Sequence, residues 1–81
     1  MELSPGDVVR IIHNVHNLEL WSEPYPQQAG AFVGLLKNTD VALIVSSEKV
    51  EDRDLRFMTH KVYTSRGLAG WVHDERLLMW V

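Results

Sequence analysis

The C-terminal stretch of the sequence most strongly constrains the fold, because short apolar runs alternate there with tight turn signals. Residues 57–64 alternate in character as a half-buried strand does, and the Ser-Arg-Gly sequence at 65–67 is typical of a hairpin turn whose glycine takes a positive φ. Residues 68–72 supply the second hairpin strand. A charged corner at 73–76 then leads to an apolar run at 77–81. The sequence therefore predicts a hairpin, a one-turn break and a closing strand.

Two further runs predict strands that pack against this unit. Residues 7–13 form a run rich in β-branched side chains, which is typical of a strand. Successive side chains of a strand point to opposite faces, and the long Arg10 keeps its charged head in water, so Val9 and Ile11 are expected to point inward. Residues 40–46 form the strongest strand pattern in the chain. Their nearly continuous apolar character predicts a central strand that is covered on both faces or lies at an interface.

A third run, residues 31–36, follows Gly30 and is interrupted by Gly34. A glycine inside a strand indicates a bulge or a tight bend. The polar residues 37–40 that follow predict a hairpin loop. This region therefore supplies one more strand and a turn.

The two remaining stretches predict connections. Residues 14–28, with two asparagines and two prolines, read as a long loop in which 18–21 could form a short strand. Residues 47–56 carry four carboxylates and three bases, which indicates a solvated connection, with a one- or two-turn helix as the alternative. In either case Val50 and Leu55 would hold this stretch against the body of the domain.

Length and composition limit the architecture. The chain has 81 residues, 46% of them hydrophobic, and no cysteine, so a single core without disulfides must stabilise it. We expect one domain, residues 1–81, that is all-β with about five strands. A closed barrel is favoured over a sandwich because closure removes exposed strand edges.

Charge and hydropathy exclude some classes of function. The net charge is −3, with 8 scattered basic residues against 11 acidic ones, which disfavours nucleic-acid binding. The N-terminal residues lack a secretory pattern, and no apolar run reaches the ~20 residues needed to span a bilayer. We therefore expect a soluble, cytoplasmic protein without a membrane role. Oligomerisation is a common supplement for so small a core, so self-association is an open alternative.

Two segments resemble SH3-like barrels of the bacterial and phage type. Residues 5–11, Pro-Gly-Asp-Val-Val-Arg-Ile, resemble the opening strand of these barrels. Residues 67–72, Gly-Leu-Ala-Gly-Trp-Val, followed by a polar corner and an apolar strand, are similar to the closing half of SH3 domains. The resemblance implies a short 3-10 turn before the last strand, and a ligand groove that is bordered by the first long loop.

The departures from SH3 domains concern their ligand. Domains that bind polyproline use an Ala-Leu-Tyr-Asp-Tyr-like strand, a tryptophan pair and a Pro-Ser-Asn-Tyr-like corner. This chain has Val-Val-Arg-Ile at 8–11, no tryptophan pair, and His-Asp-Glu-Arg at 73–76. The aromatic groove for PxxP segments therefore cannot be transferred to it.

Residue types that carry chemistry give little support to catalysis. His13 and His16 are three residues apart, but they straddle a strand end and a loop, with no third ligand near them in sequence. His60 and His73 would meet if their strands paired, forming a pH-sensitive site. Nucleophile, phosphate-loop and metalloprotease motifs are absent from the sequence. We expect no cofactor, no bound metal and no enzymatic activity.

Aromatic residues provide the candidate partner surface. Trp71 and Trp80 fall in predicted strands and are expected in the core. Trp21 and Tyr25 fall in the long loop, where a tryptophan either closes the barrel mouth as a lid or stands out as an interface anchor. The position of the first long loop in SH3-like barrels implies that Trp21, Glu23, Tyr25 and Trp71 bind the partner.

The sequence thus predicts a non-catalytic protein-interaction or assembly module, of the kind found among phage and bacterial accessory proteins. Its partner would be another protein or a second copy of itself. Two alternatives from other classes are a nucleic-acid-binding barrel and a small metal-dependent hydrolase built around the histidines.

Overall fold

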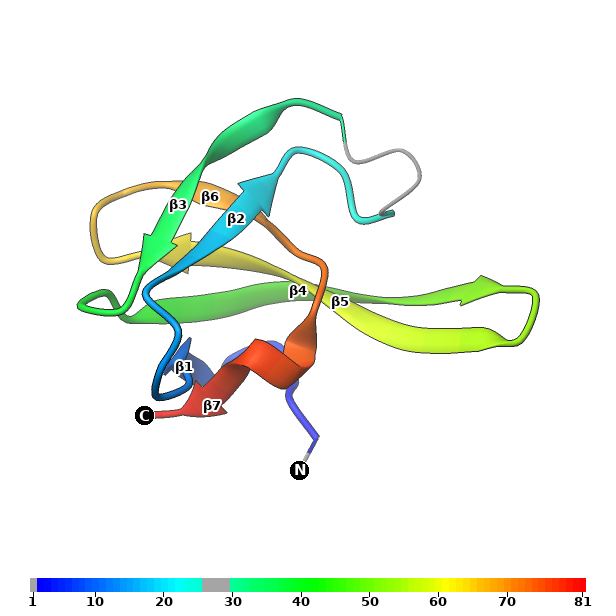
Figure 1. The fold of residues 1–81 in the computed structure, drawn as a ribbon, viewed down its shortest axis with the longest axis horizontal. Helices are drawn as coiled ribbons and strands as arrows, with labels where there is room; N and C mark the ends of the chain where they lie inside the picture. Colours follow the sequence, from blue (N-terminus) through cyan, green and yellow to red (C-terminus); the bar gives the residue numbers. More distant parts are fainter. Residues whose placement is uncertain (1, 26–29) are drawn as a thin grey trace.

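The computed structural model describes residues 2–25 and 30–81, apart from the side chains of Asp52 and Leu55. Seven strands form one antiparallel sheet in the order β3-β2-β6-β5-β4-β1-β7. The sheet curls around its own inner face like a half-barrel (Figure 1). The elements are β1 (Val8–Ile11), β2 (Asn17–Trp21), β3 (Phe32–Lys37), β4 (Ala42–Asp52), β5 (Leu55–Thr64), β6 (Ala69–Val72), η1 (Glu75–Leu77) and β7 (Leu78–Trp80).

The all-β class is confirmed, but seven strands replace the five that the sequence predicted. One source of the difference is β2, which lies within the predicted long loop. Its residues pair with β3 along their whole length, from Asn17↔Lys37 to Trp21↔Phe32. Trp21 also pairs with Trp71 of β6. Both edges of β2 thus gain partners from distant parts of the sequence.

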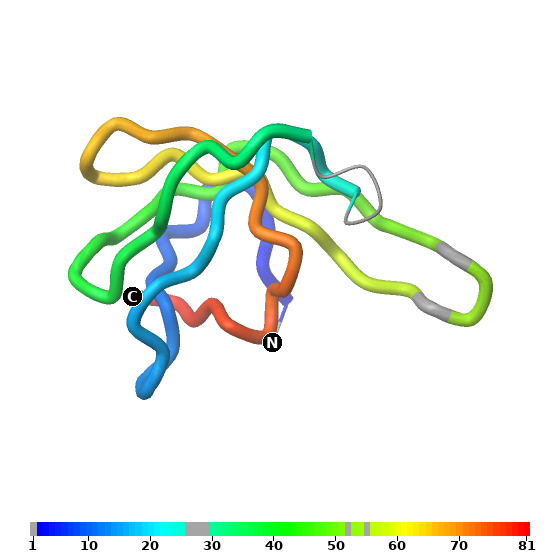
Figure 2. Tube along the Cα trace, turned by 45° about the horizontal axis from the view of Figure 1, so that its top comes forward, coloured from blue at the N-terminus to red at the C-terminus, as the bar shows by residue number. Residues whose placement is uncertain are grey.

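The charged stretch 47–56 is the second difference. It is neither a solvated connection nor a helix, but the distal half of a hairpin in which β4 and β5 stay paired as far as Asp52↔Leu55. A two-residue turn at 53–54, with Arg53 at φ +54°, joins the strands. Cross-strand neighbours of opposite charge such as Glu51 and Arg56 favour this pairing. The hairpin extends away from the body of the protein (Figure 2).

The C-terminal half follows the sequence prediction closely. β5 and β6 form a hairpin from His60↔Val72 to Tyr63↔Ala69, and Gly67 in the turn has φ +89°. A single 3-10 turn, η1, precedes β7, and the Asp74 carboxylate caps it by accepting from the Arg76 backbone N–H. β7 pairs with β1, so the last strand packs beside the first.

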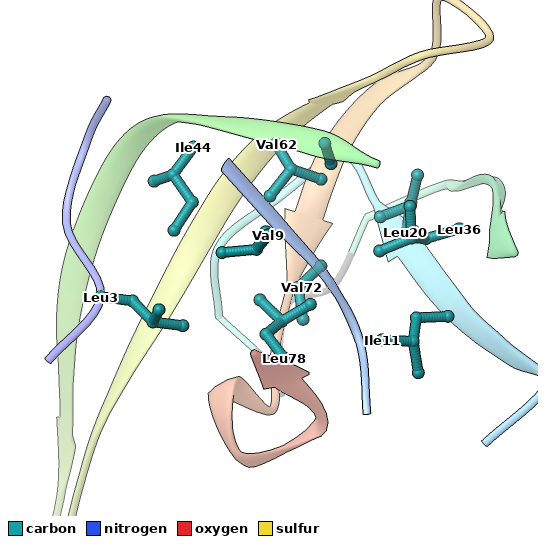
Figure 3. Close-up of a cluster of buried hydrophobic side chains, with 10 residues drawn as sticks. Leu3, Val9, Ile11, Leu20, Leu36, Ile44, Val62, Val72 and Leu78 are labelled. Carbon is teal, nitrogen blue, oxygen red and sulfur yellow. The ribbon is translucent and has the colours of Figure 1, made fainter. Parts of the chain in front are cut away.

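The inner face of the curled sheet holds the core, and every strand contributes at least one aliphatic side chain to it (Figure 3). Val9 is fully buried and Ile11 is 4% exposed, which confirms the predicted inward face of the first strand. The predicted irregularity near Gly34 is also present, because the register of β2 against β3 shifts between Leu20 and Trp21. The core residues are Leu3, Val9, Ile11, Leu20, Leu36, Ala42, Ile44, Val62, Val72 and Leu78.

The predicted hairpin loop at 37–40 is a crossover instead. A turn at 38–39 joins β3 to β4, which are not neighbours in the sheet. Asp40 is 5% exposed and fixes this turn by accepting from the Lys37 backbone N–H and from the Arg66 Nε. Arg66 also donates to the Leu35 carbonyl. The crossover is thereby tied to the β5–β6 turn.

Two burial predictions are answered within the single chain. Val41, just before β4, and Leu43 and Val45 of β4 are between 41% and 46% exposed, so this strand is not covered on both faces, and its location at an interface stays a prediction. Trp80, expected in the core, is 47% exposed, and its Nε1 donates to Asp7 Oδ2 at 3.0 Å. The Trp80 hydrogen bond, followed by one from the Ser4 N–H, holds the pKa of Asp7 below its ordinary value.

Among the described residues no helix has the length and apolar character needed to cross a membrane.

Candidate functional site

Three aromatic side chains from three neighbouring strands line up on the outer face of the sheet. Phe32 of β3 pairs with Trp21 of β2, and Trp21 pairs with Trp71 of β6. Residues directly opposite each other in antiparallel strands share one face, so the three rings form a continuous aromatic row. Phe32 is 54% exposed, and both tryptophans are half-buried.

Close approach of the strands beneath the row depends on Gly70, the residue before Trp71. A Cβ at Gly70 would lie 2.8 Å from the Cβ of Leu20 and 3.3 Å from the carbonyl oxygen of Trp21. Any side chain there would push β6 away from β2. Gly70 therefore allows the two tryptophan backbones to meet.

Trp21 is held on two sides. Its ring lies 5.8 Å from Phe32 in an edge-to-face arrangement, and 6.2 Å from His73 in a stacked one, with only 10° between the planes. His73 is itself fixed, because its Nε2 donates to the Glu23 carbonyl at 2.7 Å. A preorganised ring loses little conformational freedom when a partner binds it.

The predicted loop residues lie next to this row. Ser22 donates from its backbone to the Ala31 carbonyl and accepts from the Ala31 N–H through its hydroxyl, which closes the loop after β2. Beyond it Pro24 is buried and Tyr25 is 40% exposed. The predicted extended segment ended at Pro26, which lies outside the described residues.

Four predicted site residues are thus distributed as follows. Trp21 and Trp71 face each other across β2 and β6. Glu23 is joined to Trp21 through His73, although the contact uses its backbone carbonyl. Tyr25 has no contact with the row among those the structure describes. Trp21 ends β2 and lies on the outer face of the sheet, so it does not close the core as a lid.

A charged cleft lies beside the row, between β5 and the corner that follows β6. Its volume is about 500 Å³, and the residues that line it are Arg56, Phe57, His73, Asp74, Glu75 and Arg76. Arg76 is bound to Asp74 through Nε and Nη2, and this side-chain hydrogen bond leads the causes that hold the pKa of Asp74 below its ordinary value. The cleft therefore mixes both signs of charge, and no single charge dominates it.

A buried hydrogen-bonded chain lies under this corner. His60 has no exposed surface, its Nε2 donates to Glu75 Oε2 at 2.8 Å, and the Ser47 hydroxyl bonds its Nδ1 at 2.7 Å. The residue types are those of a hydrolytic triad, but neither Ser47 nor His60 lines a described cleft. The geometry fits a structural role, because the chain joins η1 to β4 and β5.

The histidine hypotheses are not supported. His60 and His73 have separate partners, so the predicted pairing of the two is wrong. His13 and His16 are exposed, and no group of three potential metal ligands occurs among the residues that the structure describes.

A comparison with protein-family models, with curated proteins and with solved structures found no match to this chain. Inferences about function therefore depend on the site itself.

Sequence reasoning missed Phe32 and His73, which complete the site around Trp21. The sequence pattern predicts only a strand around Phe32 and a charged corner around His73. No local pattern signals their contact with Trp21, because long-range pairing of β2 with β3 and β6 creates it.

Proposed function

We propose that the chain is a non-catalytic protein-interaction module with an SH3-like barrel, and that its partner binds over the aromatic row of Phe32, Trp21 and Trp71. Glu23 and Tyr25 would border the bound partner. The single observation that carries this proposal is the row itself. Three aromatic rings are aligned on an outward face where a solvated antiparallel sheet usually carries polar side chains.

The strand order supports the SH3-like part of the proposal. The first strand pairs with the last, β4, β5 and β6 form a meander, and one 3-10 turn precedes the closing strand. This order agrees with the closing half that the Gly-Leu-Ala-Gly-Trp-Val segment resembles. The β2–β3 hairpin then occupies the place of the first long loop.

Aromatic chemistry supports the interaction part. Tryptophan and tyrosine dominate the residues that carry binding energy at protein interfaces, because they bury a large area with few rotatable bonds. A second, smaller cleft of about 250 Å³ adjoins Trp21 and is lined in part by Glu19 and Asp74. A partner segment that places an apolar side chain on Trp21 and a basic side chain in this cleft would match both features.

The proposal is tested with two matched bait proteins. One carries Tyr25→Ser with Phe32→Ser, which removes two exposed rings and leaves Trp21 stacked on His73. The control carries Val41→Ser with Leu43→Ser, which removes comparably exposed apolar side chains from β4. Proteins recovered by the wild-type bait are purified and their dissociation constants are measured against all three baits.

The expected result is a loss of at least about 30-fold in affinity for the aromatic-row variant, equivalent to roughly 2 kcal/mol for two truncated anchors. The control is expected to bind within about threefold of the wild type. Equal affinities for the two variants would remove the aromatic row as the binding surface.

One observation favours nucleic acid as a second candidate. Lys61 of β5 pairs with Trp71, so a lysine adjoins the aromatic row on the same face. Aromatic rings with a neighbouring cation are the usual platform for single-stranded nucleic acids. This candidate predicts quenching of tryptophan fluorescence by a single-stranded oligonucleotide, weakening steeply with salt, and the net charge of −3 opposes it.

A further inference from the structure

A second apolar row crosses the outer face of the sheet, apart from the aromatic row. Val8 of β1 pairs with Leu43 of β4, Leu43 pairs with Tyr63 of β5, and Tyr63 pairs with Ala69 of β6. The Val81 N–H donates to the Val8 carbonyl at 3.1 Å, which extends the row past β7. We call these five residues the outer row.

The outer row is uncovered in the single chain. Val8 is 45% exposed, Leu43 41%, Tyr63 53% and Val81 71%. Val41 and Val45 flank it on β4 and are 41% and 46% exposed. Together these side chains leave on the order of 500 Å² of apolar surface in water, near the upper end of what a monomer exposes in one patch.

We propose that a second copy of this chain docks on the outer row, so that two sheets pack face to face around a two-fold axis that runs along β4. A standard interface buries roughly 800 Å² on each partner, of which about 60% is apolar, so the apolar area exposed by the row is of the size that such an interface requires. A core of this size gains stability from dimerisation, since a chain of 81 residues buries a limited share of its own surface.

The sizes of the side chains fit this axis. An axis along β4 brings Leu43 of one copy against Leu43 of the other, and it places β5 of each copy over β1 of the other. Tyr63 of each copy then packs on the smaller Val8 of the other copy. Large residues opposite small ones are what two packed sheets require in order to interdigitate.

The charges fit it as well. Lys61 lies on β5 two residues from Tyr63, and Arg10 lies on β1 two residues from Val8 on the opposite side of the row. Because β5 of one chain lies over β1 of the other, Lys61 of one chain does not face Arg10 of the other. Neither residue faces the same residue of the second chain. No carboxylate belongs to the outer row or its flanking valines. Arg66 also lines the depression beside the row, but its Nε donates to the Asp40 carboxylate, which offsets its charge. The apolar contact therefore forms without two unpaired like charges facing each other.

The tyrosine lies flat enough for such packing. A Cβ at Gly67 would be 3.9 Å from the Tyr63 hydroxyl, so the ring leans over the β5–β6 turn instead of standing away from the sheet. A shallow depression of about 620 Å³ extends from Val8 past Leu43 to this turn. It offers each copy a surface on which the Tyr63 of the other can rest.

The test is the mass of the protein in solution. Sedimentation equilibrium over roughly 10–300 µM should give twice the 9.3 kDa of one chain. Leu43→Arg, which places two like charges together on the axis, should give the single-chain mass with an unchanged circular dichroism spectrum. Phe32→Lys, at an apolar position of the aromatic row that is 54% exposed against 41% for Leu43, is the matched control and should stay dimeric.

A second measurement does not depend on the folding of the charged variant. The chain has no cysteine, so Leu43→Cys creates a single reactive thiol. A short bis-maleimide should link two Leu43→Cys chains, whereas Phe32→Cys chains should stay unlinked. A monomeric wild type would overturn the proposal and assign the outer row to a different partner. A folded Leu43→Arg dimer, a monomeric Phe32→Lys or an absent cross-link at position 43 would overturn it too.

These outcomes are independent of the aromatic row. Loss of partner binding in the Tyr25→Ser and Phe32→Ser bait concerns the proposed function alone, and loss of the dimer in Leu43→Arg concerns the outer row alone.

Discussion

Replacing Asp40 by alanine should lower the free energy of unfolding more than the removal of an exposed ion pair does. The carboxylate is 5% exposed and accepts from the Lys37 N–H at 2.9 Å and from the Arg66 Nε at 3.1 and 3.0 Å. Removing it leaves a backbone donor and a guanidinium without their acceptor. We expect a loss of about 2–3 kcal/mol, because hydrogen bonds to a charged group contribute about 1.5–3 kcal/mol, and water only partly replaces the acceptor of Arg66, whose side chain is 40% exposed.

The assay is thermal and urea unfolding followed by circular dichroism. A loss of this size should lower Tm by roughly 10–15 °C in a domain of this length. Arg76→Ala is the matched control, because it removes an exposed ion pair, in which the Arg76 side chain is 86% exposed, and keeps the Asp74 carboxylate that caps η1; it should cost less than about 1 kcal/mol. Equal losses for the two variants would refute the view that Asp40 anchors the crossover.

The same site predicts a pH dependence. Burial opposes ionisation of Asp40, but hydrogen bonds from Lys37 and Arg66 outweigh it, so its pKa lies below the ordinary value. A lowered pKa in the folded state gives stability that is present above the unfolded pKa of about 3.9 and is lost as the pH falls through the folded value. The free energy of unfolding should therefore drop in acid less steeply for Asp40→Ala than for the wild type.

Three further changes test other parts of the structure. His60→Ala breaks the hydrogen bonds to Ser47 and Glu75, so it should cost about 2–3 kcal/mol and speed amide exchange in η1; unchanged exchange would show that the chain does not hold the turn. Gly70→Ala places a Cβ 2.8 Å from that of Leu20 and should cost about 1–3 kcal/mol in urea unfolding, whereas Ala69→Gly beside it should change little. Trp80→Phe removes the donor to Asp7, so an NMR titration should show the Asp7 pKa rising toward its ordinary value, and an unmoved pKa would contradict the assigned cause.

Local patterns in the sequence predicted the elements whose partners are close in the chain. The β5–β6 hairpin, the positive φ of Gly67 and the turn before β7 follow from neighbouring residues. The inward face of β1 follows from strand alternation, because Val9 and Ile11 flank a charged Arg10. In these regions sequence distance and spatial distance agree.

The failures lie where distant pairing decides the structure. A short strand at 18–21 was allowed within the predicted loop, but its place between β3 and β6 was not predicted, because no local signal shows either neighbour. The stretch 47–56 has the charges of a solvated loop, yet it continues the β4–β5 hairpin, in which Glu51 and Arg56 face each other with opposite charges. Trp80 was predicted to lie in the core, but its indole N–H donates to Asp7 at the surface.

Two residues of the candidate site could be predicted from the sequence. Trp21 and Trp71 were candidates because tryptophan is a typical interface residue, but their alignment depends on the β2–β6 pairing. Phe32 and His73 joined them only through contacts between segments that are far apart in sequence. The apolar β4 pattern, in contrast, did contain the alternative that the outer row now develops, namely a strand at an interface.

We propose that the partner protein binds the outward aromatic row and not the rest of the exposed apolar surface. Calorimetric titration of that partner against the Tyr25→Ser/Phe32→Ser variant and the Val41→Ser/Leu43→Ser variant separates the two surfaces. The dissociation constant should be at least about 30-fold higher for the first variant and nearly unchanged for the second. Wild-type affinity for the first variant would exclude the aromatic row as the binding surface.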